Sequence, residues 1–171
     1  QQLLRVDAED TSPIGAASEA ELIASIADEA SRASVIILSD YAKGAVTDGV
    51  IAAALAAGKT YGIPVIADPK GRDFARYGAV DLIKPNASEL STAMRLPVET
   101  DQEIEDALTA AQTALPAKSI VVTRAAKGMS YAANGEPIVH LSGQAREVYD
   151  VSGAGDTSIA ALALGLAGGG D

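Results

Sequence analysis

The residues with the clearest chemical potential form the segment 150–157, Asp-Val-Ser-Gly-Ala-Gly-Asp-Thr, which leads into an apolar helical stretch. Gly153 and Gly155 let a ligand approach the backbone closely, and a helix that begins there presents free N–H groups and its positive dipole end. Such a cradle stabilises a phosphoryl group that gains negative charge during transfer. Asp156 could accept the proton of an attacking hydroxyl. The alternative is a glycine-rich helix start, with Asp156 as a first-turn acid favoured by the dipole.

A second candidate is the segment 86–89, Asn-Ala-Ser-Glu, which follows a predicted strand. Asn at the N-cap and Glu three residues later form a capping box, and this structural explanation is sufficient by itself. The functional interpretation is that Asn86 and Glu89 orient water-bound Mg²⁺ beside the phosphates of a nucleotide. Both interpretations can hold together, because the cap fixes the helix end from which Glu89 projects.

A third candidate is the segment 123–128, Thr-Arg-Ala-Ala-Lys-Gly, which follows another apolar run. Thr123, Arg124 and Gly128 could wrap the phosphates or the ribose of a nucleotide. The alternative is an ordinary turn between a strand and a hairpin, closed by Gly128. The segment by itself favours the turn.

Two further segments each place an acid and a base directly after a predicted strand. Asp40 is followed by Lys43, and Asp68 is followed by Lys70. Lysine ammonium groups at these positions could contact anionic groups of a substrate. Solvated turn residues are the alternative explanation.

These residues need a scaffold of strands and helices, and the hydrophobic pattern supplies one. Short apolar runs typical of strands buried on both faces occur at 35–38, 64–67, 80–83 and 119–123, with a further short strand predicted at 3–7. Helices are predicted from Ser18, with Glu21 completing a capping box, to about Arg32 and over 47–62. Further helices are predicted from about Ala87, from Thr100, which has Glu103 at capping-box spacing, and after 153–156 to about 167. Asn134-Gly135 between 129–132 and 138–141 predicts a hairpin.

Buried strands that alternate with helices predict an α/β fold with a mostly parallel sheet and a small antiparallel hairpin. Ligands of such sheets bind at the carboxyl ends of the strands. Asp40, Asp68, Asn86 and Arg124 each come just after a strand. We therefore expect the candidate residues to converge on one edge of the sheet, which a purely structural α/β domain would not explain.

Composition excludes several other classes of protein. The chain has 171 residues, enough for one domain, with 48% hydrophobic and 21% charged residues and no apolar stretch long enough to span a membrane. It has no cysteine and a single histidine, His140, to which we assign no role, so disulfides, cysteine-ligated metals and a serine–histidine–aspartate triad are disfavoured. A net charge of −10 argues against nucleic acid as a partner. A cytoplasmic protein that acts on small molecules is the default expectation.

The combination of motifs resembles the ribokinase-like (pfkB) carbohydrate kinases. The Gly-Ala-Gly-Asp loop at 153–156, preceded by Asp150, is similar to the second signature of that family, and Asn86 and Glu89 match its Mg²⁺/phosphate motif. The segments 39–44, 68–71, 122–130 and 147–151 resemble the D-glycero-β-D-manno-heptose 7-phosphate kinases within it. In many bacteria such a kinase is the first half of a bifunctional heptose kinase/ADP-heptose synthase.

This resemblance implies a ribokinase-like three-layer sandwich that transfers the γ-phosphoryl group of ATP to the anomeric hydroxyl of a heptose 7-phosphate. The 1,7-bisphosphate would be a precursor of ADP-heptose and of the lipopolysaccharide core. Asp156 would be the general base, and the amides of Gly153, Ala154 and Gly155 the anion hole. The resemblance also implies Mg²⁺ held through water by Asn86 and Glu89. The nucleotide would lie near Thr123, Arg124 and Gly128, and the sugar phosphate near Asp40, Lys43, Asp68 and Lys70.

The resemblance also predicts what the family carries outside this chain. Relatives have a preceding sugar-binding part with a small lid that often dimerises, which leaves a homodimer open for the complete enzyme, and a segment that closes the adenine site. We expect residues 1–171 to be a partial kinase domain with weak or no activity by itself. Another ribokinase-like sugar kinase and a non-catalytic nucleotide-binding module remain as alternatives. The intact Asp156 argues against the second of these.

Overall fold

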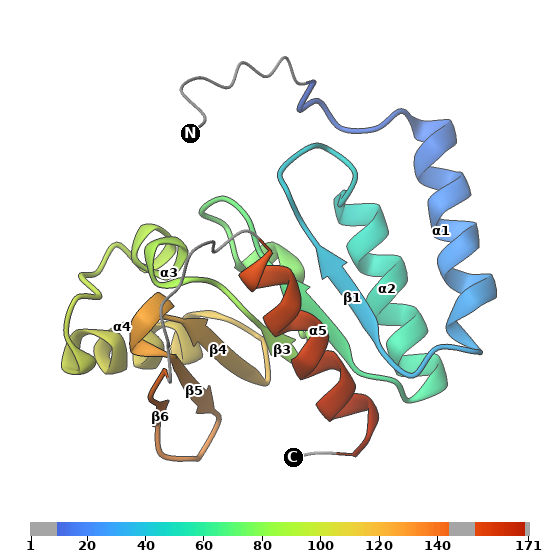
Figure 1. Ribbon diagram of the computed structural model, residues 1–171. Helices are drawn as coiled ribbons and strands as arrows, with labels where there is room; N and C mark the ends of the chain where they lie inside the picture. The colour runs from blue at the N-terminus through green and yellow to red at the C-terminus, as the bar shows by residue number, and fades with distance from the viewer. Residues whose placement is uncertain (1–9, 144–152, 170–171) are drawn as a thin grey trace, which may run out of the picture.

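A computed structural model describes residues 10–143 and 153–169 of the chain (Figure 1). The strand predicted at 3–7 and residues 150–152 of the glycine-rich segment lie outside the described residues. The described part forms one mixed sheet with helices on both faces. This arrangement confirms the predicted α/β class and its three layers.

The sheet has six strands in the described residues, and their spatial order follows the chain order, β1-β2-β3-β4-β5-β6. Strands β1 to β4 run parallel, whereas β5 and β6 form the antiparallel hairpin that the sequence predicts. Their bounds are β1 Ile36–Ser39, β2 Val65–Asp68, β3 Leu82–Ile83, β4 Ser119–Thr123, β5 Met129–Ala133 and β6 Val139–Leu141. Each of the four buried strands predicted between residues 35 and 123 is therefore confirmed within one or two residues.

Helices cover the two faces of this sheet unequally (Figure 1). Four helices contribute to the larger hydrophobic core: α1 Ala16–Ala30, α2 Asp48–Tyr61, α3 Ala87–Met94 and α4 Asp101–Ala114. The helix α5, Ala154–Ala167, crosses the opposite face, and two 3-10 turns, η1 Ala75–Tyr77 and η2 Ala125–Lys127, follow β2 and β4. In Figure 1, α1 lies outside α2, against which it packs.

Successive side chains along the parallel strands point to opposite faces of the sheet, and this alternation creates two hydrophobic cores. Ile66, Leu82 and Val121 point to the α5 face, where they meet Ile159 and Ala163. The neighbouring strand residues, such as Ile83 and Ile120, point to the other face and pack with Leu90 of α3 and Leu108 of α4. Each fully buried Leu or Ile contributes about 1.5–3 kcal/mol relative to an exposed one. Apolar side chains on both faces of the parallel strands thus hold α5 on one side of the sheet and α2 to α4 on the other.

The predicted helix ends are confirmed at three helices and wrong at one. Thr47, Asn86 and Thr100 cap α2, α3 and α4 with their side chains, and α3 and α4 have complete capping boxes. The helix α1, in contrast, begins at Ala16 after Gly15, with no side-chain cap. Ser18 and Glu21 therefore lie inside the helix and form no capping box. The first helical hydrogen bond already joins the N–H of Glu19 to the oxygen of Gly15, one turn before the predicted start.

Candidate functional site

The carboxyl ends of the four parallel strands lie at one edge of the sheet. Asp40 follows β1, Asp68 ends β2, Asn86 follows β3 and Arg124 follows β4. Ser39 pairs with Asp68 in register, and a parallel bridge joins Asn86 to Thr123. The expected convergence of the backbone positions on one edge is confirmed. The side chains of these residues, however, point in different directions and form separate groups.

The glycine-rich segment places the first turn of α5 above this edge. Gly153 is the N-cap and has φ 76°, a left-handed conformation that glycine adopts without strain. The N-cap glycine has no side chain that could bond the first amides of α5, and amides at a helix start are suited to bind an anion. Asp156 lies in the first turn and is exposed. The segment thus combines the amides of a helix start and an accessible carboxylate, as the sequence predicts.

Tyr41 reaches this carboxylate from the loop after β1. Its hydroxyl donates a hydrogen bond of 2.8 Å to Oδ1 of Asp156, across 115 positions of the chain. The hydrogen bond to Asp156, together with the charge of that carboxylate, raises the pKa of the exposed Tyr41 phenol. Tyr41 therefore stays a donor to the candidate base. Sequence reasoning did not select Tyr41, and its only signal was its place between Asp40 and Lys43.

A buried lysine lies beneath the start of α5. Lys84, the residue after β3, is only 2% exposed, and its Nζ is 3.2 Å from Oδ1 of Asp68. The same Nζ is 4.0 Å from the position that a Cβ on Gly155 would take. Burial raises the pKa of Asp68, an effect that the charge of Lys84 opposes. The sequence signal for Lys84 was a basic residue at the end of an otherwise apolar strand, and our sequence reasoning missed it.

Glu89 is held by the capping box and by a lysine. Its Oε2 accepts a 2.8 Å hydrogen bond from the N–H of Asn86, while Oδ1 of Asn86 accepts one of 2.8 Å from the N–H of Glu89. Its Oε1 forms an ion pair with Nζ of Lys70, and this hydrogen bond raises the pKa of Lys70. Both predictions for Asn86 and Glu89 thus remain compatible, because the cap orients two oxygen-bearing side chains toward the sheet edge.

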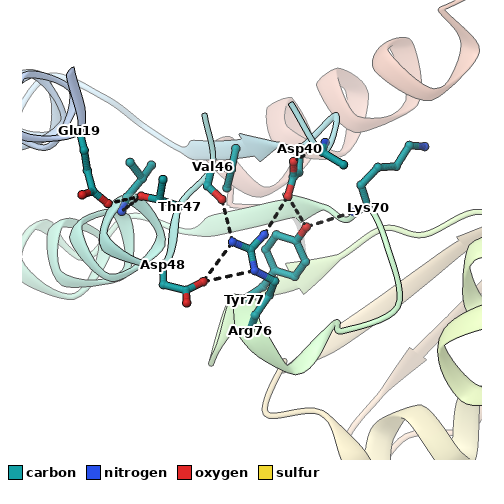
Figure 2. Close-up of polar contacts among 10 residues, drawn as sticks. Glu19, Asp40, Val46, Thr47, Asp48, Lys70, Arg76 and Tyr77 are labelled. Atoms are coloured by element: carbon teal, nitrogen blue, oxygen red, sulfur yellow. Dashed lines mark hydrogen bonds and ion pairs between the residues drawn. The ribbon is translucent and has the colours of Figure 1, made fainter. Parts of the chain in front are cut away.

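Asp40 is turned away from this group (Figure 2). Its carboxylate is buried, and it accepts hydrogen bonds from the Tyr77 hydroxyl, the Arg76 guanidinium and the N–H of Ala42. Lys43 stays exposed beside an open pocket of about 370 Å³ that also adjoins Tyr41 and Val46. Of the two residues proposed for sugar binding in this loop, Lys43 alone presents its side chain at the surface.

Arg124 belongs to a second polar cluster at the end of β4. Its guanidinium is buried, donates 3.1 Å to Oγ of Ser130, lies 3.2 Å from Nδ1 of His140, and forms an ion pair with Asp101. This ion pair lowers the pKa of Asp101. Arg124, Asp101 and His140 line an open pocket of about 530 Å³ together with Lys127. The sequence assigned His140 no role, yet its ring joins the hairpin to Arg124.

The contacts of His140 are not those of a hydrolase. Nδ1 of the ring is 2.8 Å from Oγ of Ser130, and Nε2 is 3.1 Å from Oε1 of Glu105. A serine nucleophile must be accessible to its substrate, but Ser130 has no exposed surface. Because Arg124 donates to the same hydroxyl, the cluster is a structural network.

The glycine and threonine of the same segment have clear backbone roles. Gly128 has φ 92°, and a Cβ there would lie 1.9 Å from the carbonyl oxygen of Leu141. The N–H of Thr123 donates 3.1 Å to the oxygen of Pro85, which closes the bridge beside Asn86. The turn explanation therefore accounts for Gly128 by itself, and nucleotide binding by Thr123, Arg124 and Gly128 stays a prediction.

The described residues thus form two clusters on the sheet edge. The first contains Tyr41, Asp68, Lys70, Lys84, Glu89, Asp156 and the glycines of the α5 start. The second contains Arg124 and its partners. Among residues 10–143 and 153–169, no three His, Cys, Asp or Glu side chains gather as a metal site, and no helix is long and apolar enough to span a membrane.

The geometry can be compared with known proteins. The family model described as pfkB family carbohydrate kinase matches residues 7–171. The bifunctional protein HldE of Hyphomonas neptunium is 55% identical over 169 residues, and that of Azorhizobium caulinodans is 48% identical. Each alignment covers 99% of this chain and 35% of the relative. The chain thus spans about a third of the length of these curated relatives.

Solved structures show the same fold. Arabidopsis thaliana ribokinase in complex with ribose and ATP superposes with a TM-score of 0.72 at 25% identity, and the match covers 94% of this chain and 49% of that one. Escherichia coli phosphofructokinase-2 in complex with potassium gives a TM-score of 0.78 at 21% identity over 93% of this chain and 52% of that one. The α/β arrangement described above is therefore the arrangement of these kinases.

Proposed function

The chain belongs to the pfkB family of carbohydrate kinases, and from this membership we propose that it supplies the phosphoryl-transfer part of a heptose 7-phosphate kinase. The acceptor would be the anomeric hydroxyl of D-glycero-β-D-manno-heptose 7-phosphate. The product would be the 1,7-bisphosphate, which leads to ADP-heptose and the lipopolysaccharide core in the cytoplasm. The relatives named bifunctional protein HldE support this choice of substrate.

One observation carries the proposal: an exposed carboxylate lies in the first turn of a helix whose N-cap is a glycine, with no side chain of its own to cap the helix amides. Asp156 takes the proton of the sugar hydroxyl while the hydroxyl oxygen attacks the γ-phosphorus of ATP. A new oxygen–phosphorus bond forms, the bond to the bridging oxygen breaks, and ADP leaves with that electron pair. The amides of Gly153, Ala154 and Gly155 stabilise the charge that develops on the transferred oxygens.

A buried positive charge beneath the start of α5 strengthens this anion site. The ammonium of Lys84 lies beside Gly155 and 3.2 Å from the carboxylate of Asp68. A cation that is shielded from water attracts a phosphoryl group more strongly than a surface lysine does. Lys84 therefore adds positive charge at the place where the transferred group has to be stabilised.

The donor set also fits Mg²⁺ bound through water. Glu89 and Asn86 bring carboxylate and amide oxygens, the ligand type that this cation prefers, to the same edge of the sheet. Bound there, Mg²⁺ would neutralise part of the triphosphate charge. Glu89 and Asn86 would orient its waters, and Lys70 would hold Glu89 in place.

The remaining candidates divide between the two substrates. We assign Thr123, Arg124 and Gly128 to the nucleotide, because Arg124 lines the pocket of about 530 Å³ at the end of β4 and the other two belong to the same segment. We assign Lys43, Lys70 and Asp68 to the sugar phosphate side. Asp40 is assigned there through the loop that it holds, since its carboxylate is already bonded within the protein.

A panel of acceptors on the full-length protein tests this function. We expect ADP release with Mg-ATP to depend on heptose 7-phosphate, and ³¹P NMR to detect a new phosphate on the anomeric carbon. Ribose and fructose 6-phosphate serve as comparison acceptors. A clear preference for one of them would replace the heptose assignment with another sugar kinase. ATP binding without transfer to any acceptor would favour a non-catalytic module.

The 171-residue chain by itself should be a poor catalyst, because its curated relatives are about three times longer. We expect its heptose-dependent ADP release to be weak or absent beside that of the full-length protein. Equal rates for the two would contradict the view that residues 1–171 form only part of each ligand site.

A further inference from the structure

A single buried hydroxyl joins the two loops that carry Tyr41 and Lys70. Tyr77, the last residue of η1, has no exposed surface. Its hydroxyl donates a 2.7 Å hydrogen bond to Oδ2 of Asp40, in the loop after β1. The same oxygen accepts a 3.1 Å hydrogen bond from the N–H of Lys70, in the loop after β2. Figure 2 shows this oxygen between the two loops.

The Asp40 end of this contact is rigid because the carboxylate has several other donors. Oδ1 accepts 2.7 Å from the N–H of Ala42, which fixes the turn that contains Tyr41. Oδ2 also lies 3.0 Å from Nη1 of Arg76, which in turn donates to the carboxylate of Asp48 and the carbonyl of Val46. The carboxylate of Asp40 thus fixes its own loop, and hydrogen bonds from Tyr77 and Arg76 fix the position of that carboxylate.

Each loop sends one side chain into the candidate site. Tyr41, the residue after Asp40, donates to the carboxylate of Asp156. Lys70 extends its side chain away from the ring of Tyr77, as Figure 2 shows, and pairs with Glu89. Asp156, the proposed base, and Glu89, the proposed magnesium-orienting carboxylate, are therefore each contacted from a loop that the Tyr77 hydroxyl bonds.

We propose that Tyr77 is a positioning residue: its hydroxyl fixes the loops after β1 and β2, and through Tyr41 and Lys70 it aligns Asp156 and Glu89 for phosphoryl transfer. This inference rests on the proposed function for its effect on catalysis. The coupling of the two loops, which is the structural part of the inference, depends only on the contacts described above. Alignment of this kind matters because a misplacement of about 1 Å can cost on the order of a hundredfold in rate.

The chemistry of Tyr77 suits this role. Burial raises the pKa of the phenol to about 12, so the hydroxyl stays protonated and continues to donate to Asp40 over the physiological range. Phenylalanine would keep the ring in the core and remove only the oxygen that joins the loops. Asp40 would keep Arg76 and the Ala42 amide as donors, whereas the Lys70 amide would lose the acceptor that Tyr77 supplies.

The test is Tyr77→Phe in the full-length protein, with Ser119→Ala as the matched control. Oγ of Ser119 donates 2.8 Å to the carbonyl of Asp81 at the opposite edge of the sheet, so the control also removes one hydroxyl hydrogen bond. We expect hydrogen exchange to accelerate in residues 40–44 and 69–71 of Tyr77→Phe only. We expect kcat to fall about tenfold, with the KM for ATP changed less than threefold.

A double-mutant cycle separates alignment from general destabilisation. Tyr41 is 55% exposed, so Tyr41→Phe removes its hydroxyl without a cost to the core. If Tyr77 acts through Tyr41, the two substitutions together lower kcat by less than the product of their separate effects. Multiplicative effects, or unchanged exchange in both loops, would overturn the proposal.

The two readouts also separate this inference from the proposed function. Hydrogen exchange reports the loops whether or not heptose 7-phosphate is the acceptor. A wild-type protein that phosphorylates no sugar would refute the proposed function, and the exchange result would still decide the coupling of the loops. Normal kinetics in Tyr77→Phe with an active wild type would refute the positioning role alone.

Discussion

Asp156 and Gly155 have opposite requirements for space at the start of α5. As the proposed base, the carboxylate must reach a hydroxyl of the substrate, and it is exposed and accepts a hydrogen bond from Tyr41. Gly155 must leave room, because a phosphoryl group held by helix amides lies against the backbone. Lys84 approaches this backbone from the sheet and supplies charge without filling the surface.

Gly155→Ala should separate activity from stability. A Cβ at Gly155 would lie 4.0 Å from Nζ of Lys84, an ordinary contact, and alanine is about 1 kcal/mol better than glycine in a helix. We expect an unchanged or higher Tm together with a fall in kcat/KM of about a hundredfold, because the methyl group enters the phosphoryl cradle. Gly165→Ala, in the same helix with open space around it, is the control and should leave turnover intact. Equal activity of both variants would place the phosphoryl group elsewhere.

Lys84→Met should lower stability far more than the same change at Lys118. The ammonium of Lys84 balances the half-buried carboxylate of Asp68, whereas Lys118 pairs with Asp81 at the surface. Removing one partner of a buried pair costs about 3–5 kcal/mol, and a surface pair contributes about 0–1 kcal/mol. Urea unfolding of both variants measures the difference. Similar losses would mean that Lys84 does not offset a buried charge.

At the scale of elements, α3 and α4 provide an internal comparison. Both begin with a complete capping box, Asn86 with Glu89 and Thr100 with Glu103. Local sequence determines such caps, because the partners are three residues apart, and both were predicted from the sequence. The two helices differ in surroundings: Glu89 pairs with Lys70 beside the candidate site, whereas Glu103 accepts hydrogen bonds from its own cap and from the N–H of Glu99.

Glu89→Gln should weaken the binding of Mg-ATP without unfolding α3. Glutamine still accepts the hydrogen bond of the N-cap amide, so the capping box persists. It lacks the charge that would orient hydrated Mg²⁺. Calorimetric titration should give a Kd for Mg-ATP raised about tenfold. Glu103→Gln makes the same change in the matched box of α4 and should bind like the wild type. If Glu89→Gln also binds like the wild type, the Asn86–Glu89 motif is only a cap.

The start of α1 shows where local pattern is insufficient. Ser18 and Glu21 have the spacing of a capping box, yet the helix begins before them at Ala16. The carboxylate of Glu19 bonds the hydroxyl of Thr47, at the start of α2, and Ile23 and Ile26 pack on the main core. The earlier start of α1 thus goes together with its packing against α2. The three-residue spacing of Ser18 and Glu21 carries no information about such tertiary contacts.

At the scale of the whole molecule, charge pairs tie the hairpin to α4. Arg124 after β4 pairs with Asp101 of α4 and contacts His140 of β6, and Glu105 of α4 contacts the same ring. These four residues come from three elements that meet only in the folded protein. Their contribution to stability should therefore depend on pH through the carboxylate of Asp101.

Asp101→Asn should destabilise the protein at neutral pH and have less effect in acid. The ion pair with Arg124 lowers the pKa of Asp101 in the folded protein, while the unfolded carboxyl titrates near about 3.9. Stability from this group is therefore present above about pH 4 and is lost as the pH falls through the lowered folded value. Thermal unfolding between pH 7 and pH 3 should show the difference in Tm from the wild type shrinking toward the acid end. A constant difference would assign the effect to packing.

The site was only partly predictable for a related reason. The strand ends, the glycine-rich helix start and the Asn86–Glu89 box are local patterns, and each lies where the sequence predicts. Contacts such as Tyr41 with Asp156 and Tyr77 with Asp40 join residues 115 and 37 positions apart. No single-sequence pattern encodes them, so Tyr41, Tyr77 and Lys84 were missed, and the inward direction of Asp40 was not foreseen.

The central claim is that Asp156 is the base of a sugar kinase. The measurement that tests it most directly is heptose-dependent ADP release by Asp156→Asn in the full-length protein, with Mg-ATP binding measured on the same sample. Asparagine keeps the shape of the side chain and an oxygen that can accept the Tyr41 hydrogen bond, but it cannot take the proton. We predict a loss of kcat of about 10²–10⁴-fold with nearly unchanged affinity for ATP. Turnover close to that of the wild type would contradict the account.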